Sequence, residues 1–248
     1  MKIMEFGSSH SEPLLFLHGG GLSWWNYREA AGLLAPDYHV LVPVLDGHAG
    51  SDRPFTSIED NAAEILSWID THLGGHVLLI GGLSLGAQVL LSLLSMRGDV
   101  CRHALVESAS VIPSALTHAL IGPAVSWSYP LIRSSWFARL QFQSLHMKPD
   151  LFEDYYRDSC AIRKSDMVAF MRSSTAFALP SALRNTSASV HIYAGKKETR
   201  EILFSARQIH RLLPESTETI LPGLYHGEFS MSHADAYASA VRTILKEI

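Results

Sequence analysis

Cysteine and basic charge are both scarce in this chain of 248 residues. Cys101 and Cys160 are its two cysteines, which exclude a framework of several disulfides and are typical of a protein from the reducing cytoplasm. The 20 Lys and Arg do not outnumber the 24 Asp and Glu, so the formal net charge is −4. Without a basic field, nucleic acids and anionic membranes are not expected as partners.

A long uninterrupted apolar run is also missing. The start of the chain, residues 1–6, lacks the apolar centre of a signal peptide. The most membrane-like stretch, 111–132, contains Pro113, Pro123, Pro130 and His118, which make it a poor transmembrane segment. We interpret this stretch as helices of a cap, with weak contact to a lipid surface as the alternative, and expect no stable membrane insertion.

The composition is that of an ordinary globular enzyme, with 47% hydrophobic and 18% charged residues and no internal repeat. At this length one domain with a large core is expected. Short apolar runs alternate with helical periodicity, which predicts an α/β fold with a mainly parallel sheet flanked by helices. Strands are predicted at 14–17, 39–42, 77–80, 103–106, 190–193 and 218–221. Helices are predicted at 24–34, 58–72, 85–96, 201–213 and 234–246.

The alternation stops between residues 111 and 180. This segment contains ten aromatic residues, has helical rather than strand patterning, and is divided by prolines. A helical insertion between two strands would lie above the carboxyl edge of the sheet, where ligand sites form. We therefore predict a helical cap, or lid, at 111–180, inserted into a core formed by residues 1–110 and 181–248.

The most informative motif is Gly-Leu-Ser-Leu-Gly at residues 82–86. It follows an apolar run and precedes a predicted helix. Strand, Gly-x-Ser-x-Gly and helix together are typical of a nucleophile elbow, a sharp turn that exposes a serine hydroxyl. The glycines are expected because a Cβ at Gly82 or Gly86 would clash where strand and helix approach. The candidate nucleophile is Ser84, for which a strained backbone conformation is expected.

A serine nucleophile needs a base and an acid, which follow it in the chain order serine, acid, histidine in the elbow fold. His226 lies in a loop before the last predicted helix, which favours it as the base over His233 at the helix start. Glu198 follows a predicted strand and is the preferred acid. Glu107, at the end of the preceding predicted strand, is the alternative acid.

The oxyanion that forms on attack needs preorganised backbone N–H donors. Leu85, directly after the candidate nucleophile, is expected to supply one of them. The sequence His-Gly-Gly-Gly at 18–21 predicts a turn after a strand, and glycine lets the backbone approach a substrate closely. Gly20 is the preferred second donor and Gly21 the alternative.

With these motifs, the chain resembles the alpha/beta-hydrolase superfamily along nearly its whole length. Residues 43–52 are similar to that family's Pro-Asp-x-x-Gly-His-Gly-x-Ser loop, with Val44 and Ala49 as departures. Residues 195–198 are similar to its acid-bearing segment, with Glu in place of Asp, and 222–226 match its histidine loop. The resemblance implies hydrolysis through an acyl-serine intermediate, with no metal and no organic cofactor. The start of the chain departs from the family: members often open with a β-hairpin, and here only residues 2–6 are available before the His-Gly strand, so we expect a sheet trimmed at that edge.

The leading hypothesis is a serine hydrolase of the carboxylesterase type, acting on a small or medium ester with an apolar group. The superfamily also contains carbon–carbon bond hydrolases, thioesterases, amidases and lyases, and the fold does not choose among them. A non-catalytic binder of small molecules is a third hypothesis, against which Ser84, His226 and Glu198 argue together. No histidine pair lies at helical ligand spacing beside a suitable carboxylate, so a metal enzyme is not expected. The expected partner is a small-molecule substrate, and the sequence does not indicate an oligomeric state.

Overall fold

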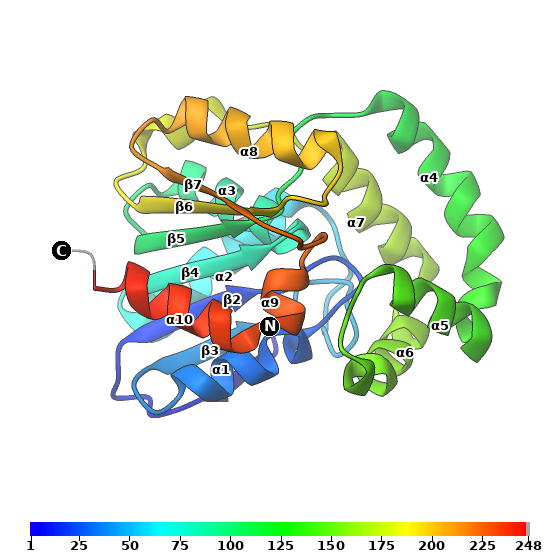
Figure 1. The fold of residues 1–248 in the computed structure, drawn as a ribbon, viewed down its shortest axis with the longest axis horizontal. Coiled ribbons are helices and arrows are strands. Elements are labelled where there is room, and N and C mark those ends of the chain that lie inside the picture. Colours follow the sequence, from blue (N-terminus) through cyan, green and yellow to red (C-terminus); the bar gives the residue numbers. More distant parts are fainter. Residues whose placement is uncertain (247–248) are drawn as a thin grey trace.

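One seven-stranded sheet forms the centre of the computed structural model, which describes residues 1–246 (Figure 1). The strand order is β1-β3-β2-β4-β5-β6-β7, with β1 antiparallel to β3 and every other pair parallel. The strands are β1 (Ile3–Phe6), β2 (Pro13–Leu17), β3 (His39–Pro43), β4 (Val77–Leu83), β5 (Cys101–Glu107), β6 (Ser189–Gly195) and β7 (Thr217–Leu221). The predicted α/β fold with a mainly parallel sheet is confirmed.

The central strands are continuous apolar runs because helices cover both faces of the sheet. Alternate residues of β2 point to opposite faces: Leu14 and Phe16 pack into one core cluster, Leu15 and Leu17 into the other. All six predicted strands form. Strand β4 runs three residues past the predicted 77–80, because Gly81 and Gly82 still pair with both neighbouring strands.

Helices α2 (Ile58–Leu73), α3 (Leu85–Met96) and α8 (Arg200–Leu212) cover one face of the sheet, and α1 (Arg28–Leu34) and α10 (Ala234–Ile244) the other (Figure 1). The helix predicted at 24–34 is divided into a 3-10 turn, η1 (Trp24–Tyr27), and α1, because Tyr27 leaves helical geometry at φ −104° and ψ 4°. Helix α10 ends at Ile244, two residues before its predicted end.

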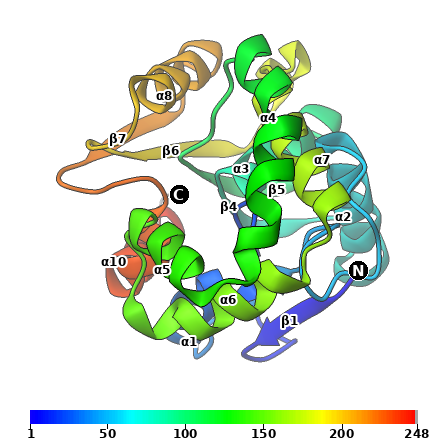
Figure 2. The same cartoon turned by 90° about the vertical axis from the view of Figure 1, so that its right-hand side faces the viewer.

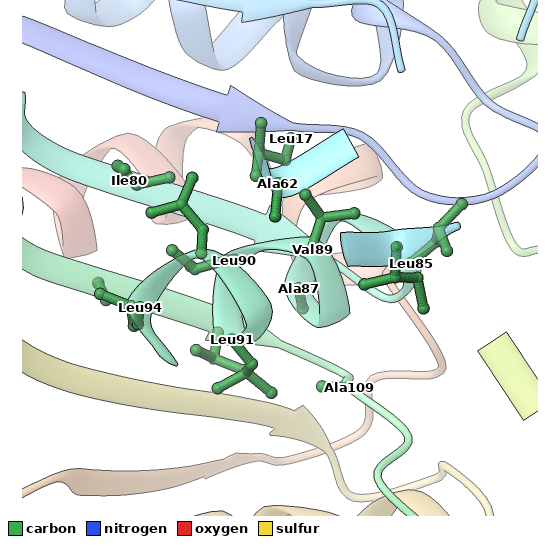
Figure 3. Packing of buried hydrophobic residues seen from close by; sticks show 14 of the residues in the cluster. Leu17, Ala62, Ile80, Leu85, Ala87, Val89, Leu90, Leu91, Leu94 and Ala109 are labelled. Carbon is green, nitrogen blue, oxygen red and sulfur yellow. The ribbon is translucent and has the colours of Figure 1, made fainter. Parts of the chain in front are cut away.

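Helix α3 fixes the position of the elbow because it is buried along most of its length. Every residue from Leu85 to Leu94 is buried. Figure 3 shows apolar side chains of α3, among them Val89 and Leu90, packed close to Leu17 of β2 and Ala62 of α2. A helix that packs on all sides cannot shift without disturbing the core, so the turn at its first residue is held rigidly.

Residues 111–180 contain no strand and form a set of helices beyond the carboxyl ends of the strands (Figures 1 and 2). The longer elements are α4 (Ala115–Ser128), η2 (Tyr129–Arg133), α5 (Ser135–Ser144), α6 (Phe152–Ala161) and α7 (Lys164–Ala176). The prolines do not divide the segment everywhere, because α4 continues through Pro123. That proline is exposed, so water can reach the carbonyl that loses its N–H partner.

Candidate active site

Ser84 lies at the sharp turn between β4 and α3. Its φ of 53° and ψ of −110° are strained for a residue with a side chain. A Cβ at Gly82 would lie 2.5 Å from the Gly86 carbonyl oxygen, and one at Gly86 would overlap the carbonyl of Leu17. Both glycines are therefore required by close backbone approach, as the motif predicts. The Ser84 N–H donates to the Glu107 carbonyl over 2.9 Å, which anchors the turn to β5.

The structure brings Ser84, His226 and Glu198 into one chain of hydrogen bonds. Ser84 Oγ lies 3.1 Å from His226 Nε2, and His226 Nδ1 lies 2.8 Å from Glu198 Oε2. Because a carboxylate can only accept, Nδ1 carries the imidazole proton and Nε2 is left free to accept from the serine hydroxyl. This is the arrangement in which a histidine can remove a proton from a serine.

The Glu198 side chain is fully buried and its carboxylate is well supplied with donors. Its Oε1 accepts the Ser108 hydroxyl over 2.7 Å and the Gly195 N–H over 2.8 Å. Burial favours the neutral acid, but the hydrogen bonds from His226, Ser108 and Gly195 outweigh it and hold the pKa of Glu198 below its ordinary value. Glu198 therefore stays ionised, as needed to stabilise a protonated imidazole.

Ser108 contacts the acid but was not among the site residues predicted from the sequence. It directly follows β5, has a positive φ of 57°, and donates its backbone N–H to the Tyr193 carbonyl over 2.9 Å. These contacts aim its hydroxyl at Glu198 from the neighbouring strand. A polar residue at the carboxyl end of a buried strand was the available signal for its role.

Glu107, the alternative acid, does not contact His226. Its side chain is 1% exposed and accepts the Ser230 N–H over 3.2 Å. Burial raises the pKa of Glu107 to about 8, with a smaller contribution from the charge of Glu198. Glu107 is therefore a neutral acid at neutral pH, and of the two carboxyl groups only Glu198 is placed to orient His226.

The Gly20 and Gly21 amides differ in what they contact. The Gly21 N–H donates to His48 Nε2 over 3.0 Å, so it is already occupied. Within residues 1–246 the structure shows no acceptor for the N–H of Gly20 or of Leu85. Gly20 lines the cavity in front of Ser84. This geometry favours Gly20 and Leu85 over Gly21 as donors to an oxyanion.

Two buried histidines hold the loop that contains these glycines. His18 Nε2 accepts the Leu45 N–H over 3.1 Å, and His48 Nε2 accepts the N–H of Gly21. Burial lowers the pKa of His18 to about 3 and that of His48 to about 4, so both rings are neutral and can act as acceptors. The loop at 43–52 therefore supports the glycine turn directly through His48, a contact that the sequence pattern did not indicate.

A cavity of about 410 Å³ lies between Ser84 and helices α4 to α7. Within residues 1–246, no Asp, Glu, Lys or Arg lines it. Of the ten aromatic residues at 111–180, only Tyr155 and Phe170 contribute to its lining. The polar side chains of its wall are those of His226 and of six residues without an ionised group: Ser84, Ser128, Gln141, Ser144, Tyr155 and Ser159.

Buried and half-buried polar contacts fix these helices over the sheet. Trp25 Nε1 donates to Asp158 over 2.8 Å, and Arg28 pairs with Asp154 over 2.6 Å. On the other side, the Phe55 N–H donates to Asp166 over 3.1 Å. Helices α6 and α7 are thus tied to the segments that follow β2 and β3.

Within residues 1–246, no three His, Cys, Asp or Glu side chains gather to hold a metal ion, and no helix is long and apolar enough to cross a bilayer. Cys101 and Cys160 are free thiols.

The sequence profile described as "Alpha/beta hydrolase family" matches residues 14–240. Solved structures with a similar fold include the enol-lactonase from Burkholderia xenovorans LB400, with 15% identity and a TM-score of 0.84 over 99% of this chain and 96% of that one. A thermophilic esterase from Thermogutta terrifontis has 17% identity and a TM-score of 0.81, over 99% of this chain and 93% of that one. An esterase from Rhodococcus sp. ECU1013 has 21% identity and a TM-score of 0.77, over 99% and 94%. No curated protein matches the chain in sequence.

Proposed function

Since the chain belongs to the alpha/beta hydrolase family, we propose that it is a serine hydrolase that cleaves carboxylic esters through an acyl-serine intermediate. The observation that carries this proposal is the hydrogen-bonded chain from Ser84 through His226 to Glu198. A binding protein without catalysis has no need for a strained serine aimed at an oriented imidazole. The two free cysteines support a cytoplasmic location.

In the acylation half, Ser84 Oγ attacks the ester carbonyl carbon and passes its proton to His226 Nε2. The ionised Glu198 stabilises the resulting imidazolium through Nδ1. The N–H groups of Gly20 and Leu85 donate to the carbonyl oxygen as it becomes an oxyanion. Collapse of the tetrahedral intermediate breaks the bond to the alcohol, which takes the proton from Nε2 as it leaves.

Deacylation uses the same groups in the opposite order. A water molecule gives a proton to His226 Nε2 as its oxygen attacks the acyl carbon. The second tetrahedral intermediate then releases the carboxylic acid and returns the proton to Ser84. Apart from the ester and the water molecule, both halves use only groups of this chain.

The walls of the cavity support a small or medium ester with an uncharged, apolar acyl or alcohol part. No ionised partner for a substrate charge lies within the described lining, and burying an unpaired charge is costly. We propose that residues 111–180 act as the cap that shapes this cavity, on a core of residues 1–110 and 181–248. Its contacts to the core through Asp158 and Asp166 support that division.

A fluorophosphonate probe tests the nucleophile. The wild type should be labelled once per chain, and Ser84→Ala should not be labelled. Ser144→Ala is the matched control, because Ser144 lines the same cavity but has no histidine partner, and it should be labelled like the wild type. Equal labelling of Ser84→Ala, or an unlabelled wild type, would contradict the proposal.

A substrate panel tests the bond that is cleaved. Matched p-nitrophenyl butyrate, butyryl thioester, butyryl anilide and β-diketone substrates share an acyl part of similar size. The highest kcat/KM is expected for the ester. A higher value for any other member would assign the protein to that chemistry instead.

A further inference from the structure

The five most exposed large apolar side chains within residues 1–246 all lie on the consecutive helices α4 and α5. We call these five the apolar face: Leu116 (74% exposed), Leu120 (56%), Trp127 (76%), Trp136 (64%) and Leu140 (60%). Elsewhere in the described chain no such side chain exceeds 45%. Single exposed apolar residues are ordinary, whereas a group of the largest ones marks an interaction surface.

Helical spacing puts these side chains on the outer sides of both helices. Leu116, Leu120 and Trp127 lie on one stripe of α4, while its inner residues Ile121 and Val125 are buried. On α5, Trp136 and Leu140 are four residues apart, opposite the buried side of that helix. In Figure 1, α4 and α5 extend farthest beyond the carboxyl ends of the strands. Helices α4 and α5 are thus apolar on their outer sides, which no described residue covers.

The charge of this segment differs from that of the whole chain. Between residues 111 and 149 there is no Asp or Glu, and the charged residues are Arg133, Arg139 and Lys148, of which Lys148 is paired with Glu29. The whole chain has a net charge of −4, which led us to expect no attraction to anionic membranes. That expectation averages over the sequence, whereas a surface senses the charges nearest to it, within about 10 Å at ordinary salt.

We propose that the apolar face binds the surface of an anionic lipid bilayer, with α4 and α5 lying in the interface. Tryptophan is favoured at the depth of the headgroups, and basic residues beside it are attracted to anionic lipid. Amphipathic helices lie in such an interface without crossing it. A second copy of the chain fits less well, because a two-fold contact through this face would place Arg133 and Arg139 of both copies in or beside one interface, with no Asp or Glu of residues 111–149 to pair with them.

The same helices form part of the cavity wall. Ala124 and Ser128 of α4, and Gln141 and Ser144 of α5, line it, and Ala124 and Ser144 are also exposed. In the proposed orientation, a protein that rests on lipid through α4 and α5 holds this part of the cavity wall close to the bilayer. A neutral apolar ester dissolved there could enter without crossing water, and only this consequence rests on the proposed function.

Vesicle flotation tests the proposal. Ser84→Ala should be used as the background, so that lipid hydrolysis does not interfere, with phosphatidylcholine vesicles that contain about 30% phosphatidylglycerol. Trp127→Ser with Trp136→Ser should weaken binding at least tenfold. Phe204→Ser, which removes an exposed aromatic of α8, is the matched control and should bind like its background. Pure phosphatidylcholine, or about 1 M NaCl, should weaken binding severalfold.

Fold integrity is checked separately, with Ser84 intact. Neither tryptophan lines the cavity, so the double variant should hydrolyse a water-soluble ester like the wild type. The proposal is supported if the Ser84→Ala background protein binds the vesicles and the double substitution abolishes this binding. No binding to anionic vesicles, or equal binding by the double variant, would overturn it. A wild-type dimer that becomes monomeric in the double variant, without vesicle binding, would also overturn it and assign the face to a contact between copies.

Discussion

The Ser108 hydroxyl donates to Glu198 Oε1 over 2.7 Å, across the ends of two neighbouring strands. The other oxygen of that carboxylate contacts His226. Ser108 therefore acts on the imidazole only through Glu198, as a positioning residue. Hydrogen bonds to a charged group contribute about 1.5–3 kcal/mol each, so losing this one should be measurable.

Ser108→Ala should lower kcat about tenfold with little change in KM, because the carboxylate loses one donor and becomes less well fixed. The acid limb of the plot of kcat against pH should shift to higher pH, because the lost hydrogen bond favours the ionised carboxylate of Glu198. Ser108→Gly accepts the positive φ and separates loss of the hydroxyl from backbone strain. Ser110→Ala removes a similar hydroxyl–carboxylate bond, to Glu201, outside the site. A similar loss in both alanine variants would contradict the role of Ser108.

The two candidate acids should respond differently to the same substitution. Glu198→Gln cannot stabilise an imidazolium and should lower kcat by about 10³-fold or more. Glu107→Gln retains an acceptor for the Ser230 N–H and should stay within about threefold of the wild type. Steady-state measurement of kcat for the two purified variants decides between the acids. A larger loss of kcat in Glu107→Gln than in Glu198→Gln would assign the catalytic role to Glu107.

Glu107 should make the protein less stable as the pH rises. Its pKa is about 8 in the folded protein against an ordinary value of 4.5. Between these values the folded state retains a proton that the unfolded state has lost, so the free energy of unfolding falls with rising pH. Glu107→Gln does not titrate, so its Tm should fall less from about pH 5 to about pH 8. Glu59→Gln, on the exposed side of α2, is the control, and its Tm should depend on pH as that of the wild type does. An equal dependence of Tm on pH in all three proteins would contradict this role of Glu107.

An ionised substrate should be a poor one. The described lining offers no cation to a carboxylate, so p-nitrophenyl hydrogen succinate should have a kcat/KM about 100-fold below that of p-nitrophenyl butyrate. Leu145→Lys places a cation in the cavity wall and should reduce the difference in kcat/KM between the two esters. Rates of alkaline hydrolysis correct for the intrinsic reactivity of the two esters. Near-equal values for the wild type would show that charge does not determine selection.

Local sterics explain why the sequence predicts so much of this molecule. A tight strand–turn–helix requires glycine on both sides of Ser84, so the turn is visible in five residues. The contact from Gly21 to His48 joins positions 27 residues apart, and no local pattern reveals it. Likewise, aromatic content predicts a cap but not which ring faces inward: Phe170 lines the cavity, while Trp127 is exposed. Which side of a helix faces the cavity depends on how the helices pack against one another, and sequence spacing alone does not determine this packing.

The bond from Ser108 to Glu198 also has a consequence for the helical segment between them. Ser108 directly follows β5, and Glu198 lies three residues after the end of β6. The two residues are 90 positions apart in the chain, and residues 111–180 lie between them. Their distance is nevertheless set by the pairing of β5 with β6, in which Glu107 lies opposite Tyr193. The length of residues 111–180 can therefore change without moving the acid away from the imidazole.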